Sequence, residues 1–82
     1  MHTIGWAVKE LQDGSRVARA GWNGKGMWLA LEHPAPALGA LKVTLPYVYM
    51  STAQGDIVPW TCSQSDLLAT DWELATADAA VS

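Results

Sequence analysis

The segment 21–28, Gly-Trp-Asn-Gly-Lys-Gly-Met-Trp, combines residue types that suit contact with a small anionic ligand. Glycine lets the backbone come close to a ligand, and tryptophan offers a flat apolar face with one N–H donor. Lys25 adds a mobile positive charge. The same segment also fits a tight turn that carries two core side chains, so both interpretations stay open at this point.

Polar residues elsewhere suit recognition of a nucleotide. Asn23 and Gln64 each carry an amide that both donates and accepts, as the edge of a purine requires. Asp66 can accept from a ribose hydroxyl or an exocyclic amine. For Asp66, helix capping is the plainer alternative.

The charges are distributed unevenly along the chain. All five basic residues lie in the first 42 positions, and the segment from residue 43 onward has five acids and no base, within a net charge of −3. Duplex binding relies on many phosphate contacts, so we exclude it. One small anion is still compatible with the sequence if Arg16, Arg19 and Lys25 converge, because arginine binds phosphate in a bidentate way. Surface solvation is the alternative for the two arginines.

Tryptophan is abundant, with five copies in 82 residues and no phenylalanine. Trp6 and Trp72 are expected in the core. Trp22 lies in a glycine-rich loop, and Trp28 faces away from its apolar strand neighbours. These two are predicted to be exposed platforms on which a base can stack.

A catalytic set is not evident. Ser63 and Asp66 are close in sequence, but the only histidines, His2 and His33, are distant from them. The pair Ser63 and Asp66 resembles a helix start, with Asp66 in the place of the usual Glu or Gln of a capping box. The residues Asp71 and Glu73 fit a solvated strand edge. We therefore expect no enzyme, metal site or cofactor.

The length predicts a single domain, and its stability requires explanation. Small domains usually need disulfides, metals or partner subunits, and Cys62 is the only cysteine. Oligomerisation is therefore the predicted source of stability. Because no apolar run reaches the roughly 18 residues of a membrane span and no signal peptide is recognisable, a cytoplasmic location is expected.

Periodicity predicts an α+β fold: an N-terminal helix packed on a small antiparallel β-sheet, with a short helix near the C-terminus. Thr3 is the expected cap of the first helix, and Pro46 suggests an edge position or a bulge in its strand. The domain is expected to span 1–75, followed by a flexible tail, 76–82. The predicted elements are a helix at 4–13, a strand at 15–20, a turn at 21–26, a strand at 27–33, a loop at 34–41, strands at 42–50 and 56–61, a helix from Ser63 to about Ala69, and a strand at 71–74.

Four blocks of the sequence, 3–7, 19–29, 45–50 and 58–72, resemble a family of small phage and prophage proteins. That family is the second type of Thoeris anti-defence protein. The resemblance runs from Thr3 to about Leu74.

The resemblance implies a non-catalytic sponge. Members of the family sequester the cyclic ADP-ribose isomer that a TIR-domain enzyme makes in Thoeris defence, and some also bind cyclic oligonucleotides of CBASS defence in separate pockets. Similar members assemble as homotetramers in the bacterial host cytoplasm, with ligand pockets between subunits.

The positions that match the family's binding blocks are Trp22, Asn23, Trp28, Gln64 and Asp66. Ala18 and Ala20 depart from the bulkier or basic residues of many relatives, which argues against a strongly basic pocket rim.

Two other functions are compatible with the residues alone. Tryptophan platforms also serve modules that bind single-stranded nucleic acid or glycans, although the acidic second half argues against nucleic acid. A purely structural phage protein, with all five tryptophans in the core, is the third alternative.

Overall fold

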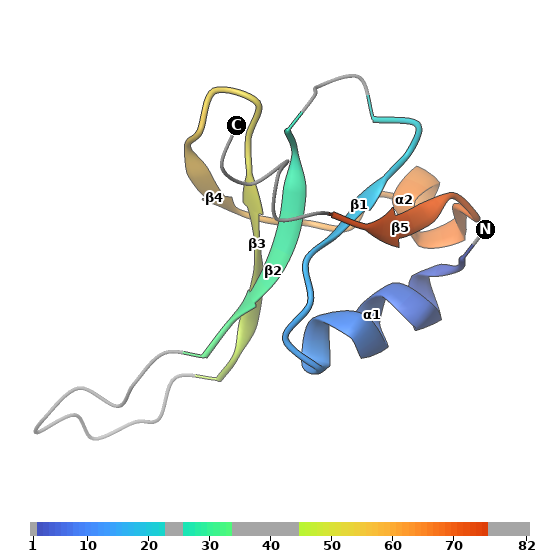
Figure 1. The fold of residues 1–82 in the computed structure, drawn as a ribbon, viewed down its shortest axis with the longest axis horizontal. Coiled ribbons are helices and arrows are strands. Elements are labelled where there is room, and N and C mark those ends of the chain that lie inside the picture. The colour runs from blue at the N-terminus through green and yellow to red at the C-terminus, as the bar shows by residue number, and fades with distance from the viewer. Residues whose placement is uncertain (1, 23–25, 34–44, 76–82) are drawn as a thin grey trace, which may run out of the picture.

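The computed structural model describes residues 2–22, 26–33 and 45–75 (Figure 1). Its α+β architecture confirms the predicted fold class, with a helix at the N-terminus, a five-stranded antiparallel sheet and a short helix near the C-terminus. The strands lie in the order β4-β3-β2-β1-β5. The elements are α1 (Ile4–Gln12), β1 (Val17–Arg19), β2 (Trp28–Glu32), β3 (Tyr47–Ser51), β4 (Ile57–Pro59), α2 (Gln64–Leu68) and β5 (Trp72–Leu74).

Helix α1 forms where the apolar spacing predicts it. Ala7 and Leu11 are buried, one turn apart on the side that faces the sheet. The helix ends at Gln12, and Gly14 beyond it has φ of 93°, a left-handed conformation that glycine adopts at low cost. Thr3 occupies the N-cap position, as predicted, although its side chain makes no capping hydrogen bond.

The register of the strands places the core on one face of the sheet. Val17 pairs with both Leu29 and Leu74, and Leu29 pairs with Met50. Directly paired residues point to the same side of an antiparallel sheet. Helix α1 packs against this side through β1, β2 and β5, and α2 packs against α1. We call this side the helical face.

The alternate residues point to the other side, which we call the second face. Trp28, Ala30 and Tyr49 lie on it, since Ala30 pairs with Tyr49 and Trp28 pairs with Ser51. The tyrosines of β3 are therefore separated from Val48 and Met50, as the alternation predicts. Among the described residues, the packing of both helices is with the helical face.

Proline 46 is accommodated differently from the prediction. Strand β3 is an interior strand, between β2 and β4, rather than an edge. Pro46 precedes Tyr47, the first paired residue of β3, so its missing N–H takes nothing from the ladder. The predicted loop 34–41, part of the predicted strand 42–50 and the predicted tail 76–82 lie outside the described residues.

Candidate functional site

Three tryptophans meet on the helical face, and we call them the tryptophan cluster: Trp22, Trp60 and Trp72. Trp22 and Trp60 each meet the ring of Trp72 edge-on, with centroid distances of 5.6 and 6.1 Å and interplanar angles of 79° and 89°. Edge-to-face pairs of this kind are favoured by the ring quadrupoles. Trp72 is 1% exposed and belongs to the core as predicted, whereas the other two are half-buried and retain accessible surface.

Helix α2 holds the cluster in place from one side. Its N-cap Ser63 accepts a hydrogen bond from the Asp66 amide at 3.1 Å, which confirms the predicted cap. The Trp72 indole donates to the Asp66 carbonyl oxygen at 3.2 Å, and so ties β5 to the helix. The Asp66 side chain, which would form the other half of the capping box, also has partners outside the helix, Arg19 and Trp22.

The Asp66 carboxylate instead joins two residues that lie more than forty positions away in sequence. Its Oδ1 atom accepts from Trp22 Nε1 at 3.2 Å and from Arg19 Nη1 at 2.8 Å. Burial raises the pKa of Asp66, but the hydrogen bonds from Arg19, Trp22 and Ser63 outweigh it and leave that pKa below its ordinary value.

A second carboxylate occupies the other side of the guanidinium. Arg19 Nε donates to Asp71 Oδ1 at 2.8 Å, and the Gly21 amide donates to Asp71 Oδ2 at 2.8 Å. The hydrogen bond from Arg19 lowers the pKa of Asp71, and the bonds to Asp71 and Asp66 raise the pKa of Arg19. We call Arg19, Asp66 and Asp71 the Arg19 cluster.

The Arg19 cluster carries one positive and two negative charges. Its guanidinium is bound on two edges by carboxylates, and its side chain is 20% exposed. A phosphate at this point would have to displace a carboxylate and would be repelled by the other. The cluster therefore suits a ligand group that donates hydrogen bonds better than it suits an anion.

Arg16 lies elsewhere, against the second face. Its guanidinium carbon is 4.2 Å from the centroid of the Trp28 ring, and Tyr49 meets the same ring edge-on at 5.9 Å. This is a cation–π contact. Within the described ranges, Arg16 has no ion pair. We call Arg16 and Trp28 the Arg16–Trp28 pair.

The convergence of the two arginines that one anion site would require is therefore not found. Arg16 and Arg19 are three positions apart, and side chains alternate between the faces of a strand, so an odd separation puts them on opposite sides. Trp28 also differs from the prediction, because the ring is 8% exposed rather than an open platform.

The structure thus brings together three of the predicted site residues, Arg19, Trp22 and Asp66. Gln64 begins α2 and is exposed near them. Arg16 and Trp28 belong to the second face, and Asn23 and Lys25 lie outside the described residues.

Sequence reasoning missed two participants. Trp60 follows the edge strand β4 and reaches Trp72 across the helical face. Its position after a proline at a strand end could have suggested a surface-facing indole. Asp71 was interpreted as part of a solvated strand edge, and no local signal shows that Arg19 and Gly21 would meet it.

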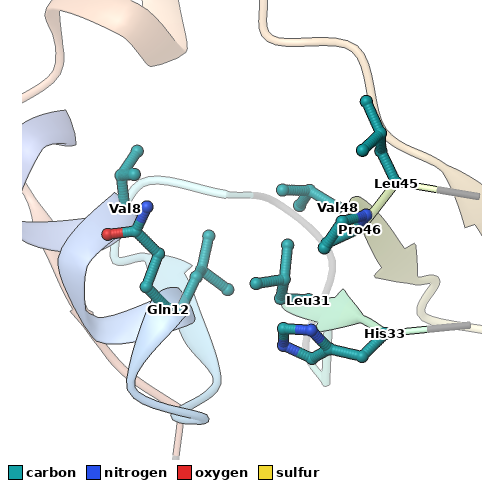
Figure 2. Close-up of a pocket in the computed structure, with 8 residues that line it drawn as sticks. Val8, Gln12, Leu31, His33, Leu45, Pro46 and Val48 are labelled. Atoms are coloured by element: carbon teal, nitrogen blue, oxygen red, sulfur yellow. The ribbon is translucent and has the colours of Figure 1, made fainter.

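A separate cavity of about 480 Å³ lies between α1 and the ends of β2 and β3. Figure 2 shows Val8 and Gln12 of the helix on one side and Leu31, His33 and Val48 on the other. Gln12 and His33 are its only polar side chains among the eight lining residues, so the cavity is mainly apolar and has no lysine or arginine for a phosphate.

Two further features, a metal-ligand cluster and a membrane-spanning helix, are both absent from the described ranges. No three His, Cys, Asp or Glu side chains gather there as the ligands of a metal ion would. Neither α1 nor α2 has the length and apolar character that crossing a membrane requires.

Comparison with known proteins gives two findings. A family model described as the Thoeris anti-defense 2-like domain matches residues 2–75. The chain is also 30% identical over 90 residues to a protein of Bacillus phage SP01 named Thoeris anti-defense 2, and the match covers 90% of this chain and 94% of that protein.

Proposed function

This chain belongs to the Thoeris anti-defense 2-like family, and from that premise we propose that it counters Thoeris defence as a non-catalytic sponge. It binds a second messenger of the cyclic ADP-ribose type and keeps it intact. Family membership over residues 2–75 is the observation that carries the proposal. The host cytoplasm, where such a messenger is made, is the proposed location.

The tryptophan cluster supports this function because it offers stacking surface beside a hydrogen-bond acceptor. Trp22 and Trp60 are half-buried, so each keeps indole surface for a base. Stacking of this kind is worth about 1–3 kcal/mol per base. We assign Asp66 the role of accepting from an exocyclic amine or a ribose hydroxyl, with the exposed Gln64 beside it.

The pyrophosphate of such a ligand needs other groups, because Arg19 is bound by two carboxylates. Asn23 and Lys25, in the segment that follows Trp22, are our candidates for it. Arg16 and Trp28 lie on the second face and cannot reach the same ligand within one protomer. We assign them to a separate contact, for which a cyclic oligonucleotide is the proposed ligand.

Self-association is part of the proposal. Leu45, Ile57 and Leu68 are 76%, 66% and 76% exposed, which leaves apolar surface for partner subunits to cover. We propose a homotetramer whose ligand pockets lie between subunits, so that more of the ligand is enclosed. Light scattering should give the mass of four chains at micromolar concentration, and a monomer would contradict the shared pocket.

A direct test of sequestration separates a sponge from an enzyme. The protein is incubated with a cyclic ADP-ribose isomer made by a TIR-domain enzyme, freed of unbound ligand and then denatured. We expect the intact messenger in the supernatant, identified by mass spectrometry. A hydrolysed product would show that the protein is an enzyme instead.

Trp22→Ala tests the proposed stacking residue. We expect at least a tenfold loss of affinity for the same isomer, by calorimetry, with the assembly unchanged. Trp6→Ala is the matched control, because Trp6 is also half-buried but its described ring contact is with His2, at 3.9 Å, rather than with a tryptophan of the cluster. Equal affinity of Trp22→Ala and the parent protein would remove Trp22 from the pocket.

A tryptophan module for single-stranded nucleic acid or glycans is the alternative function. Arg16 favours it, since arginine contributes cation–π contacts in sites for single strands, although the Trp28 ring beneath it is buried. An affinity for oligonucleotides that falls steeply with salt would support it over the sponge.

A further inference from the structure

Asp71 stands at the junction of three segments of the chain. It immediately precedes β5, and its two carboxylate oxygens contact the end of β1 and the turn that follows β1. Oδ1 accepts from Arg19 Nε at 2.8 Å, and Oδ2 accepts from the Gly21 amide at 2.8 Å. Arg19 Nη2 lies 3.5 Å from Oδ2, so the guanidinium meets the carboxylate along one edge.

Gly21 shows that this approach is tight. A Cβ atom placed on Gly21 would lie 2.8 Å from Asp71 Oδ2, closer than real Cβ contacts come. Gly21 is not among the described glycines with positive φ, which are Gly14, Gly26 and Gly55. A side chain at position 21 would therefore have to displace the Asp71 carboxylate, whereas the backbone conformation of Gly21 is not the constraint.

The contacts continue from Asp71 to the tryptophan cluster. Asp71 fixes the orientation of the Arg19 guanidinium, whose Nη1 donates to Asp66 Oδ1. The same Oδ1 accepts from the Trp22 indole, so the position of Asp66 determines where that indole is held. The other oxygen of Asp71 accepts from the Gly21 amide and so fixes the backbone directly before Trp22. Asp71 thus acts on Trp22 by two routes, through Arg19 and Asp66 and through the turn.

We propose that Asp71 is a positioning residue for the ligand site: it does not touch the ligand but sets the orientation of Trp22 and the start of the glycine-rich segment. That a ligand binds here rests on the proposed function, but the effect of Asp71 on the orientation of Trp22 can be measured without a ligand. Both oxygens of Asp71 are already engaged with Arg19 and Gly21, which leaves the contact with a base to Trp22.

The central variant is Asp71→Asn, which keeps the shape of the side chain. An amide has one oxygen, so its NH₂ group must face either Arg19 or the Gly21 amide, both of which are donors. We expect the affinity for the cyclic ADP-ribose isomer to fall about fivefold or more. Asp56→Asn is the matched control, because it removes the same charge from an exposed residue in the turn between β3 and β4.

A readout without ligand distinguishes positioning from general stability. The Trp22 indole N–H donates to Asp66, and its NMR signal should move toward the value of a solvent-exposed indole in Asp71→Asn, while the signal of the Trp72 indole, bonded to a carbonyl, keeps its place. An unchanged Trp22 signal would overturn the proposal, whatever happens to binding. If the Trp22 signal shifts in Asp71→Asn but the parent protein binds no messenger, the positioning role is supported and the proposed function is rejected.

A double-substitution cycle provides the second test. Gly21→Ala should shift the Trp22 signal in the parent protein, because the new Cβ meets the carboxylate. In an Asp71→Ala background the carboxylate is gone, so Gly21→Ala should add little further change. Equal effects of Gly21→Ala in both backgrounds would contradict the contact between residues 21 and 71.

Discussion

The two arginines of the first strand region serve opposite faces of one small sheet, in different ways. Arg19 lies on the helical face and is bound by Asp66 and Asp71, each at 2.8 Å. Arg16 lies against the second face and rests on the ring of Trp28 at 4.2 Å. The charge of Arg19 is offset by two carboxylates, whereas no described carboxylate is paired with Arg16.

This difference shows what each arginine is available to do. The guanidinium of Arg19 has donors committed on two edges, so it organises protein groups and offers little to an anion. Among the described residues, the guanidinium of Arg16 contacts the Trp28 ring through its flat face and has no side-chain hydrogen-bond partner, so its N–H donors are not committed to any of them. The residue most suited to a phosphate is thus on the face opposite the tryptophan cluster.

Removing the charge of Arg19 should give the largest effect on stability. Arg19→Gln leaves two carboxylates without their shared cation, and hydrogen bonds to charged groups are worth about 1.5–3 kcal/mol. We expect the free energy of unfolding to fall by about 2 kcal/mol, measured by urea denaturation. A loss no larger than that of Arg16→Gln would remove the distinction between the two arginines.

Acid should weaken the Arg19 cluster next. The pKa values of Asp66 and Asp71 are lowered in the folded protein from the ordinary value of 3.8, so their stabilising contribution is present above that value and is lost as the pH falls below it. The free energy of unfolding should therefore decrease from pH 5 to pH 3.

Variants show whether this slope comes from the cluster. Arg19→Gln should flatten the dependence on pH, because the carboxylates then lose the partner that lowers their pKa values. Arg16→Gln should keep the slope of the parent protein. The same slope in all three proteins would place the acid sensitivity in other carboxylates.

The smallest effect is expected from Arg16→Gln. A partly exposed cation–π contact is worth about 0.5–1 kcal/mol, so the unfolding midpoint should change little. The indole of Trp28 should become more accessible. Acrylamide quenching of tryptophan fluorescence, compared between Arg16→Gln and the parent protein, measures this change. If Arg16→Gln lowered the free energy of unfolding more than Arg19→Gln does, Arg16 rather than Arg19 would be the more important arginine for stability.

Local patterns were sufficient for most of the fold. The spacing of Ala7 and Leu11 in α1, the alternation along β2 and β3, and the serine cap of α2 each depend on near neighbours, and all three are found in the structure. Thr3 is the N-cap of α1 as predicted, but without a hydrogen bond from its side chain. Strand order was beyond such patterns, and so Pro46 suggested an edge where the structure has an interior strand.

For the candidate site, too, local sequence predicted some features and the tertiary structure decided others. The sequence alone determined the supply of groups: indoles, a glycine-rich segment, two arginines and a few carboxylates within one α+β domain, together with the family resemblance. Only the tertiary structure decided their partners, because Arg19 meets Asp66 and Asp71 across 47 and 52 positions of chain. Such contacts follow from strand pairing between β1 and β5, which joins the two ends of the domain and which no local spacing records.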